Sequence, residues 1–159
     1  MKIRIICIGK LKEKYWTSAA AEYSKRISGY ANIEIVELKE SKLPSNPSEA
    51  DENSVLIREG QNILGKIKES DYVIAMEVEG EQLDSVELAK KIQCTFDTKS
   101  STVNFIIGGS LGLSDKVKKR ANYGLSFSKL TFPHQMARIM LLEQIYRAFK
   151  INSGETYHK

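Results

Sequence analysis

The stretch Val103-Asn104-Phe105-Ile106-Ile107, followed by Gly108-Gly109-Ser110-Leu111-Gly112, decides the fold. A short apolar run of this kind is typical of a strand in the middle of a parallel sheet, where both faces are covered. The glycines directly after it predict a tight turn into a helix, with backbone N–H groups that can face a ligand. The turn has neither the GxGxxG spacing nor a Walker lysine, so without further observations a plain turn is the simpler interpretation.

Outward from this strand, apolar patterns of two kinds alternate along the chain. Further strands are predicted over Lys2–Gly9, Ile33–Leu38, Tyr72–Val78 and Tyr123–Phe127. Helices are predicted over Glu13–Ser28, Glu52–Lys68, the segment that follows Asp84, Ser114–Ala121 and Gln135–Lys150. This alternation indicates an α/β fold with a mainly parallel sheet and helices on both faces. We also expect a loop over Lys39–Asp51, a turn at Gly80, and a single domain over residues 1–159.

Composition excludes several classes of protein. The chain has 159 residues, 42% of them hydrophobic and 28% charged, as in an ordinary soluble globular protein. The longest apolar runs, Ile5–Ile8 and Ile139–Leu142, are far too short for a membrane span, and the first ten residues lack the features of a secretory signal. Cys7 and Cys94 are far apart and have no neighbouring histidine, which argues against a zinc site and a disulfide scaffold. The sequence therefore predicts a cytoplasmic protein with no membrane segment and no metal.

Charge is distributed unevenly along the chain. The formal net charge is +4, and the segment from Asp115 to Lys159 holds nine basic and three acidic residues. The rest of the chain is slightly acidic. A basic end of this kind suggests a polyanionic partner such as a nucleic acid, although on charge alone a solvated lysine face is the simpler interpretation.

The segments that follow the predicted strands are the first places to look for a site, because ligands of parallel sheets bind at the carboxyl ends of the strands. Besides the glycine turn, an acidic turn spans Ala75–Gly80, and Leu125–Gln135 passes from Ser, Lys and Thr to Pro-His at a helix start. Small hydroxyl residues and proline suit a loop whose backbone faces a ligand. His134, one of two histidines, lies beside this loop and is either a functional residue or an ordinary cap.

The last helix and the tail are also unusual. Apolar residues cover more than one stripe of Gln135–Lys150, which predicts a second apolar face against another subunit. Its polar residues are expected to be functional or to form internal ion pairs such as Glu143–Arg147. The ending Tyr157-His158-Lys159 either frays or offers groups that stack on a base and contact phosphate.

Taken together, these residues resemble the ribosomal large-subunit methyltransferase H family, which are small SPOUT-class methyltransferases. The resemblance spans the whole chain. Its most specific parts are Thr131-Phe132-Pro133-His134-Gln135, Glu143-Gln144-Ile145-Tyr146-Arg147-Ala148-Phe149-Lys150 and Tyr157-His158-Lys159. Weaker parts are the glycine turn, Gly9-Lys10-Leu11-Lys12 with Tyr15, and Glu59-Gly60.

The resemblance implies a trefoil knot in the C-terminal half of the α/β fold, which no periodicity of the sequence predicts. It also implies a homodimer and S-adenosylmethionine as the cofactor. By motif match, the residues that bind the cofactor are Met76, Gly108, Phe127, Ser128, Lys129, Leu130, Thr131 and Phe132.

The resemblance further implies the acceptor, which is N3 of a pseudouridine in helix 69 of 23S rRNA within the 70S ribosome. His134 and Arg138 are the candidates for positioning the base or a phosphate, and Tyr157 and His158 of the partner subunit are candidates for the acceptor site. The group that removes the N3 proton is left open among His134 and the partner's Tyr157 and His158. Two alternatives are a SPOUT enzyme that acts on tRNA and a non-catalytic RNA-binding or ribosome-assembly protein.

Overall fold

A five-stranded sheet forms the centre of the computed structural model, which describes residues 1–158. The strand order is β2-β1-β4-β3-β5, and every neighbouring pair is parallel. The strands are β1 (Lys2–Ile8), β2 (Asn32–Leu38), β3 (Tyr72–Gln82), β4 (Thr102–Ile107) and β5 (Tyr123–Ser126). The helices are α1 (Lys14–Ile27), α2 (Glu49–Leu64), α3 (Ser85–Thr98), α4 (Asp115–Arg120) and α5 (His134–Asn152). Lys159, which contributes to the predicted basic end and to the Tyr-His-Lys motif, lies outside the described residues.

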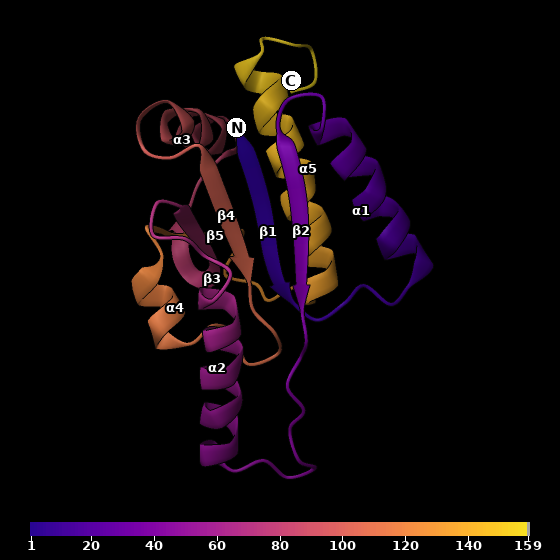
Figure 1. Ribbon diagram of the computed structural model, residues 1–159. Helices are drawn as coiled ribbons and strands as arrows, with labels where there is room; N and C mark the ends of the chain where they lie inside the picture. The colour runs from indigo at the N-terminus through magenta and orange to yellow at the C-terminus, as the bar shows by residue number, and fades with distance from the viewer. Residues whose placement is uncertain (159) are drawn as a thin grey trace.

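Helices cover both faces of the sheet, which confirms the predicted α/β architecture (Figure 1). One hydrophobic cluster joins α1, α3 and α5 to the sheet, and a second joins α2 and α4 to its other face. Strand β1 supplies both clusters, with Ile3 and Ile5 in the first and Ile6 and Ile8 in the second.

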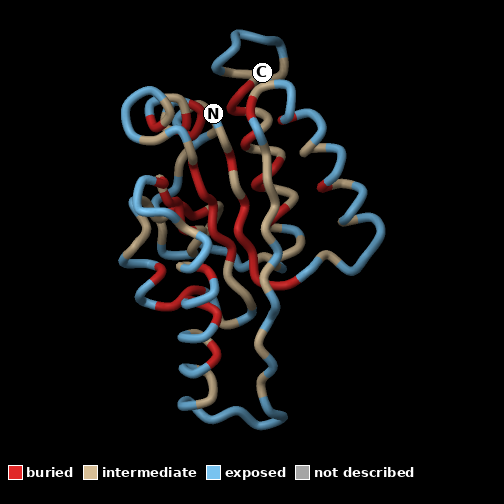
Figure 2. Tube along the Cα trace, in the orientation of Figure 1, coloured by how far each residue is buried: buried red, intermediate tan, exposed pale blue. Residues whose placement is uncertain are grey.

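Strand β4 lies between β1 and β3, and its residues are buried from Val103 to Ile107, as the apolar run predicted (Figure 2). Asn104 interrupts the apolar pattern but has partners in the interior. Its side-chain amide donates to Asp71 at 2.9 Å and accepts from Arg4 at 3.1 Å. Because these buried polar groups are hydrogen-bonded, they do not carry the desolvation cost of unpaired ones.

The predicted loop over Lys39–Asp51 is too long at its C-terminal end, because α2 already begins at Glu49. Ser48 caps this helix. The backbone N–H of Asp51 donates to the Ser48 hydroxyl at 3.2 Å, and the Ser48 N–H donates to the Asp51 carboxylate at 2.8 Å. This reciprocal capping box satisfies free N–H groups of the first turn, so the helix starts three residues earlier than predicted.

The predicted turn at Gly80 is wrong, because β3 continues to Gln82. Leu125 of β5 pairs with both Met76 and Glu81, so the residues between them bulge out of the ladder. A Cβ atom on Gly80 would lie 2.7 Å from the carbonyl carbon of Leu125. Glycine is therefore required here for close approach of two strands, and the bulge redirects side chains at the carboxyl edge of the sheet.

Candidate functional site

A cavity of about 600 Å³ lies at the carboxyl ends of β3, β4 and β5. This volume falls within the range of roughly 300–1,000 Å³ that is usual for small-molecule sites. Its walls come from the β3 bulge, the glycine turn, the loop between β5 and α5, and the first turn of α5. The structure thus brings together the three strand ends that the sequence analysis singled out.

The glycine turn contributes backbone rather than side chains to the wall of the cavity. Gly112 has a φ of +80°, and its N–H donates to the carbonyl of Gly109 at 3.1 Å. A Cβ atom on Gly108 would lie 2.5 Å from the carbonyl oxygen of Gly112. The turn can close on itself only because these positions carry no side chain.

The loop between β5 and α5 curves around the other side of the cavity. The hydroxyl of Ser126 donates to the carbonyl of Ser128 at 3.0 Å, and the Leu130 N–H donates to the hydroxyl of Ser128 at 3.1 Å. The predicted cofactor residues that line the cavity are Met76, Gly108, Phe127, Ser128, Leu130, Thr131 and Phe132. Lys129 is exposed and is absent from this lining, so its cofactor contact stays a prediction.

Charged residues that the sequence analysis did not select also line the cavity. Glu77 and Glu79 enter it from the β3 bulge, and Lys118 of α4 lies 3.9 Å from the Glu77 carboxylate. The acidic turn after Met76 was the available signal. That these acidic residues line the cavity was not predictable, because their position depends on the register shift between β3 and β5.

Glu59 of α2, which belongs to the motifs that resemble the family, packs against the glycine turn. Its carboxyl group is buried and accepts the backbone N–H of Ser41 at 3.0 Å. A Cβ atom on Gly109 would lie 3.4 Å from this carboxyl group, which therefore abuts the turn. Burial raises the pKa of Glu59, an effect to which the nearby Glu40 adds.

His134 and Arg138 start α5 but have different surroundings. His134 lines the cavity. The Arg138 side chain is only 1% exposed; its Nη1 donates to Glu37 at 2.7 Å and its Nη2 donates to the carbonyl of Gly9 at 3.1 Å. Its Nε is buried and has no partner among the described residues. Arg138 is thus one of the paired residues that the sequence predicted within this helix, and its contact with the acceptor stays a prediction.

The partner of Arg138 is held in its charged form. Burial acts to raise the pKa of Glu37, but hydrogen bonds from Arg138 and from the Leu11 N–H outweigh burial and hold the pKa below its ordinary value. The Leu11 N–H donates to the same carboxylate oxygen at 2.9 Å. One ion pair, with a buried guanidinium and a carboxylate that is 33% exposed, therefore joins the ends of β1 and β2 to the start of α5.

The tail packs against the middle of α5. The hydroxyl of Tyr157 donates to Glu143 at 3.2 Å, and its ring lies at an edge to that of Tyr146, with 5.0 Å between centroids. Arg147 pairs with Glu143 at 2.6 Å, which confirms the predicted internal ion pair, and its guanidinium lies 4.6 Å from the Tyr157 ring. Burial, followed by the charge of Glu143, raises the pKa of Tyr157.

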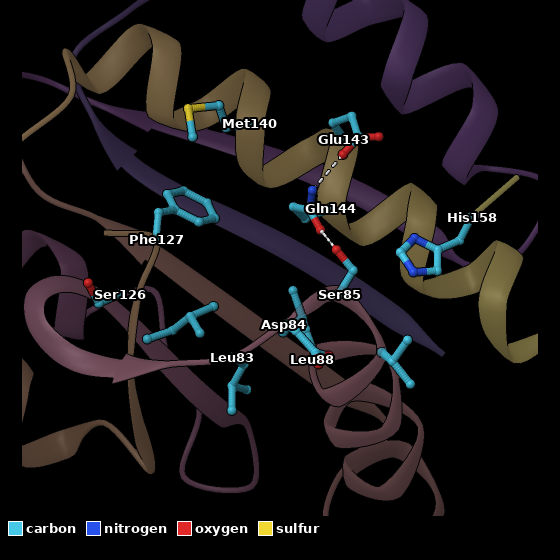
Figure 3. A pocket seen from close by; sticks show the side chains of 12 residues that line it. Leu83, Asp84, Ser85, Leu88, Ser126, Phe127, Met140, Glu143, Gln144 and His158 are labelled. Carbon is cyan, nitrogen blue, oxygen red and sulfur yellow. Dashed lines mark hydrogen bonds between the residues drawn. The ribbon is translucent and has the colours of Figure 1, made fainter. Parts of the chain in front are cut away.

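His158 lines a second cavity, of about 540 Å³, between α3 and α5 (Figure 3). The hydroxyl of Ser85 donates to the side-chain carbonyl of Gln144 at 2.8 Å across this cavity. Phe127 lines both cavities, whereas His158 and Tyr157 are absent from the lining of the first. Within one chain, the tail is therefore not brought together with His134.

Both cysteines are free, with Cys7 buried and Cys94 exposed. Burial raises the pKa of the Cys7 thiol to about 11. Among residues 1–158, no group of three or more His, Cys, Asp or Glu side chains is arranged to hold a metal ion. No helix in the same residues combines the length and apolar character needed to cross a membrane.

Known proteins match the chain over its whole length. The family model described as "Predicted SPOUT methyltransferase" matches residues 1–158. Proteins named ribosomal RNA large subunit methyltransferase H from Clostridium novyi (strain NT) and Bacillus cytotoxicus are 55% and 54% identical to it, each aligned over 100% of both chains.

A solved structure supports the fold. A probable methylase family protein from Haemophilus influenzae Rd KW20 has a TM-score of 0.54 and 16% identity, with 99% of this chain and 70% of that chain covered. At this identity the likeness is one of fold alone. The family model and the full-length relatives confirm the resemblance that the motifs indicated: the chain belongs to the SPOUT methyltransferases, within the family of ribosomal RNA large subunit methyltransferase H.

Proposed function

We propose that this methyltransferase uses S-adenosylmethionine to methylate N3 of a pseudouridine in helix 69 of 23S rRNA, on the assembled 70S ribosome. It does so in the cytoplasm, as a homodimer of single-domain chains. One observation carries the proposal: seven of the eight residues predicted to bind the cofactor line one cavity, in a chain whose full-length relatives are named for rRNA methylation.

The cavity suits S-adenosylmethionine in size and chemistry. Backbone groups of Gly108 and of the loop Phe127–Phe132, together with Met76, are the groups that would hold it. The lining holds two acidic residues, Glu77 and Glu79, against one lysine, Lys118, which favours a cationic ligand over an anionic one. When bound, S-adenosylmethionine supplies a methyl group that is already activated by its positively charged sulfur. The protein therefore contributes mainly by positioning, which is worth roughly 7–11 kcal/mol in well-oriented reactions.

The acceptor must lose the proton at N3 to become a good nucleophile, and a positioned base contributes about 10²–10⁴-fold to such a step. His134 lines the cofactor cavity, which supports it as a group that holds the acceptor or takes this proton. Tyr157 and His158 of the partner subunit are the other candidates. Arg138 acts by holding Gly9 and Glu37 beside the start of α5.

A second copy of the chain explains two features of the fold. Leu130, which lines the cofactor cavity, is 70% exposed, and Met136 in the first turn of α5 is 38% exposed, although most apolar residues of α5 lie in or against the hydrophobic core. Tyr157 and His158 lie away from the cavity of their own chain. A homodimer would cover the exposed apolar residues and bring the tail of each chain to the cavity of the other.

Calorimetric titration tests the cofactor part of the proposal. We expect S-adenosylmethionine to bind with one site per chain. Adenosine triphosphate is the matched control, because it shares the adenosine but carries phosphates, which the acidic bulge should repel. No binding of S-adenosylmethionine, with retained binding of rRNA, would favour a non-catalytic RNA-binding protein and contradict the proposal. Equal binding of both nucleotides would contradict the assigned pocket.

A further inference from the structure

The connection between β1 and α1 carries exposed lysines next to exposed aromatic residues. Lys10, Lys12 and Lys14 are all exposed, and Glu13 is the one acidic residue among them. Tyr15 is 64% exposed, and its ring lies 5.1 Å from that of the half-buried Trp16. We call Lys10–Trp16 the lysine–aromatic segment. It belongs to the motifs of the resemblance, but the proposed methyl transfer assigns it no role.

The lysine–aromatic segment is anchored at the same edge of the sheet as the cofactor cavity. It leaves the end of β1 in Figure 1, where α5 also begins. The Gly9 N–H donates to the carbonyl of Leu38 at 2.8 Å, which fixes the segment to the end of β2. A Cβ atom on Gly9 would lie 3.6 Å from Nε2 of His134, so the start of the segment borders a residue that lines the cavity.

The ion pair between buried Arg138 and the partly exposed Glu37 strengthens this anchor. Arg138 donates to the carbonyl of Gly9 at 3.1 Å, and Glu37 accepts the Leu11 N–H at 2.9 Å. Burying the charge of Arg138 is costly unless its partners are well oriented, so the ion pair by itself is weak evidence for stability. Here it fixes the path of the backbone directly before Lys12 and Tyr15.

The charges of Lys12 and Lys14 are free to meet a ligand, and Lys10 also lies close enough to Glu37 to contribute to the lowered pKa of that carboxyl group. Within residues 1–158, none of Lys10, Lys12 and Lys14 takes part in an ion pair of the structure. An exposed Tyr ring beside free ammonium groups is the combination that binds unpaired nucleotides, because bases stack on the ring and phosphates attract the lysines. RNA recognition targets loops whose bases are unstacked.

We propose that the lysine–aromatic segment binds the RNA acceptor outside the cofactor cavity, with Tyr15 stacking on an unpaired base and the three lysines contacting phosphates. This inference rests on the proposed function, in which the acceptor is a loop of rRNA. It assigns Arg138 and Glu37 as positioning residues for this surface. The partner is a single-stranded RNA loop whose backbone passes from the cavity toward α1.

The test measures RNA binding and cofactor binding separately. The probe is a fluorescein-labelled RNA stem-loop with the sequence of helix 69, followed by anisotropy at several salt concentrations. Replacing Lys10, Lys12 and Lys14 together by alanine should raise the Kd at low salt by about tenfold or more. The slope of log Kd against log salt should fall by about 2–3, since each phosphate contact contributes roughly 0.7–0.9. The Kd of S-adenosylmethionine for this triple variant should stay within about twofold of the wild-type value.

A matched variant controls for net charge. Lys25, Lys68 and Lys99 are exposed and lie at the opposite edge of the sheet, before β2, β3 and β4. Replacing these three by alanine removes the same charge and should leave the Kd and the salt slope of the RNA within about twofold of wild type. Equal weakening by both triple variants would overturn the proposal, because it would reduce the effect to overall charge.

Tyr15 is tested on its own. Tyr15→Ala should raise the Kd of the RNA at least about fivefold. Tyr15→Phe, which keeps the aromatic ring, should bind the RNA like wild type. If Tyr15→Ala changed the oligomeric mass in light scattering and left RNA affinity unchanged, the surface would be a protein contact and the proposal would be wrong. Methyl transfer by the wild-type protein to 70S ribosomes is measured in parallel. If the protein binds the RNA and S-adenosylmethionine but transfers no methyl group, the proposed function is refuted. The RNA-binding curves of the variants still decide the present inference.

Discussion

Replacing Gly108 by alanine should damage the cofactor cavity without unfolding the protein. The new Cβ atom would lie 2.5 Å from the carbonyl oxygen and 2.7 Å from the carbonyl carbon of Gly112. Both atoms belong to the backbone of a turn that is closed by its own hydrogen bond, so neither can rotate away. Such overpacking costs about 1–3 kcal/mol. If the shifted turn loses its fit to the ligand, this cost corresponds to roughly a 5- to 150-fold higher Kd for S-adenosylmethionine.

Calorimetry with S-adenosylmethionine measures this effect, and circular dichroism melting checks that the variant is folded. Gly29→Ala is the matched control, because its Cβ atom would meet nothing closer than the carbonyl of Arg26, at 3.6 Å. We expect Gly29→Ala to bind like wild type. If a folded Gly108→Ala variant bound S-adenosylmethionine as tightly as Gly29→Ala, the glycine turn would not form part of the cofactor site.

Three further predictions concern other parts of the molecule. Cys94 should react with a thiol reagent in the folded protein near about pH 8, whereas Cys7 should react only after unfolding, because burial raises the pKa of its thiol to about 11; two fast thiols in the folded protein would contradict this. Glu37→Gln should cost about 1–3 kcal/mol in urea unfolding at neutral pH, because it weakens a charged hydrogen bond to buried Arg138. The pKa of Glu37 in the folded protein lies below 4.5, so the stability that the Glu37 carboxylate contributes is present above pH 4.5 and is lost as the pH falls through the pKa of the folded state. Glu37→Gln should therefore lose less stability than wild type on acidification. Parallel losses in both proteins would argue against the ion pair. His158→Ala should keep S-adenosylmethionine binding and lower methyl transfer to 70S ribosomes; unchanged turnover would remove His158 from the acceptor site.

Local patterns were sufficient to predict most of the fold. The apolar run of β4 and the helix predicted after Asp84 depend on neighbours a few residues away, and both are confirmed. The turn at Gly80 was mispredicted because the glycine serves a contact with β5, more than forty residues later in the chain. The implied trefoil knot stays a prediction, since it concerns the path of the chain, and no local pattern encodes such a path.

The candidate site was predictable where it follows a general rule. Ligands bind at the carboxyl ends of parallel strands, and the β3 bulge and the loops after β4 and β5 do share one cavity. The partner of Arg138 was not predictable, because Glu37 is 101 residues away in the sequence. The separation of His158 from His134 was equally hidden, since it depends on how the tail folds back along α5.

Transfer of a labelled methyl group tests the central claim most directly. The acceptors are 70S ribosomes that lack the modification, free 23S rRNA and tRNA, each incubated with the protein and labelled S-adenosylmethionine. Our account predicts label on the 70S ribosomes alone, at N3 of a pseudouridine in helix 69 when the RNA is digested and analysed by mass spectrometry. Label on tRNA, or no label on any acceptor despite cofactor binding, would contradict it.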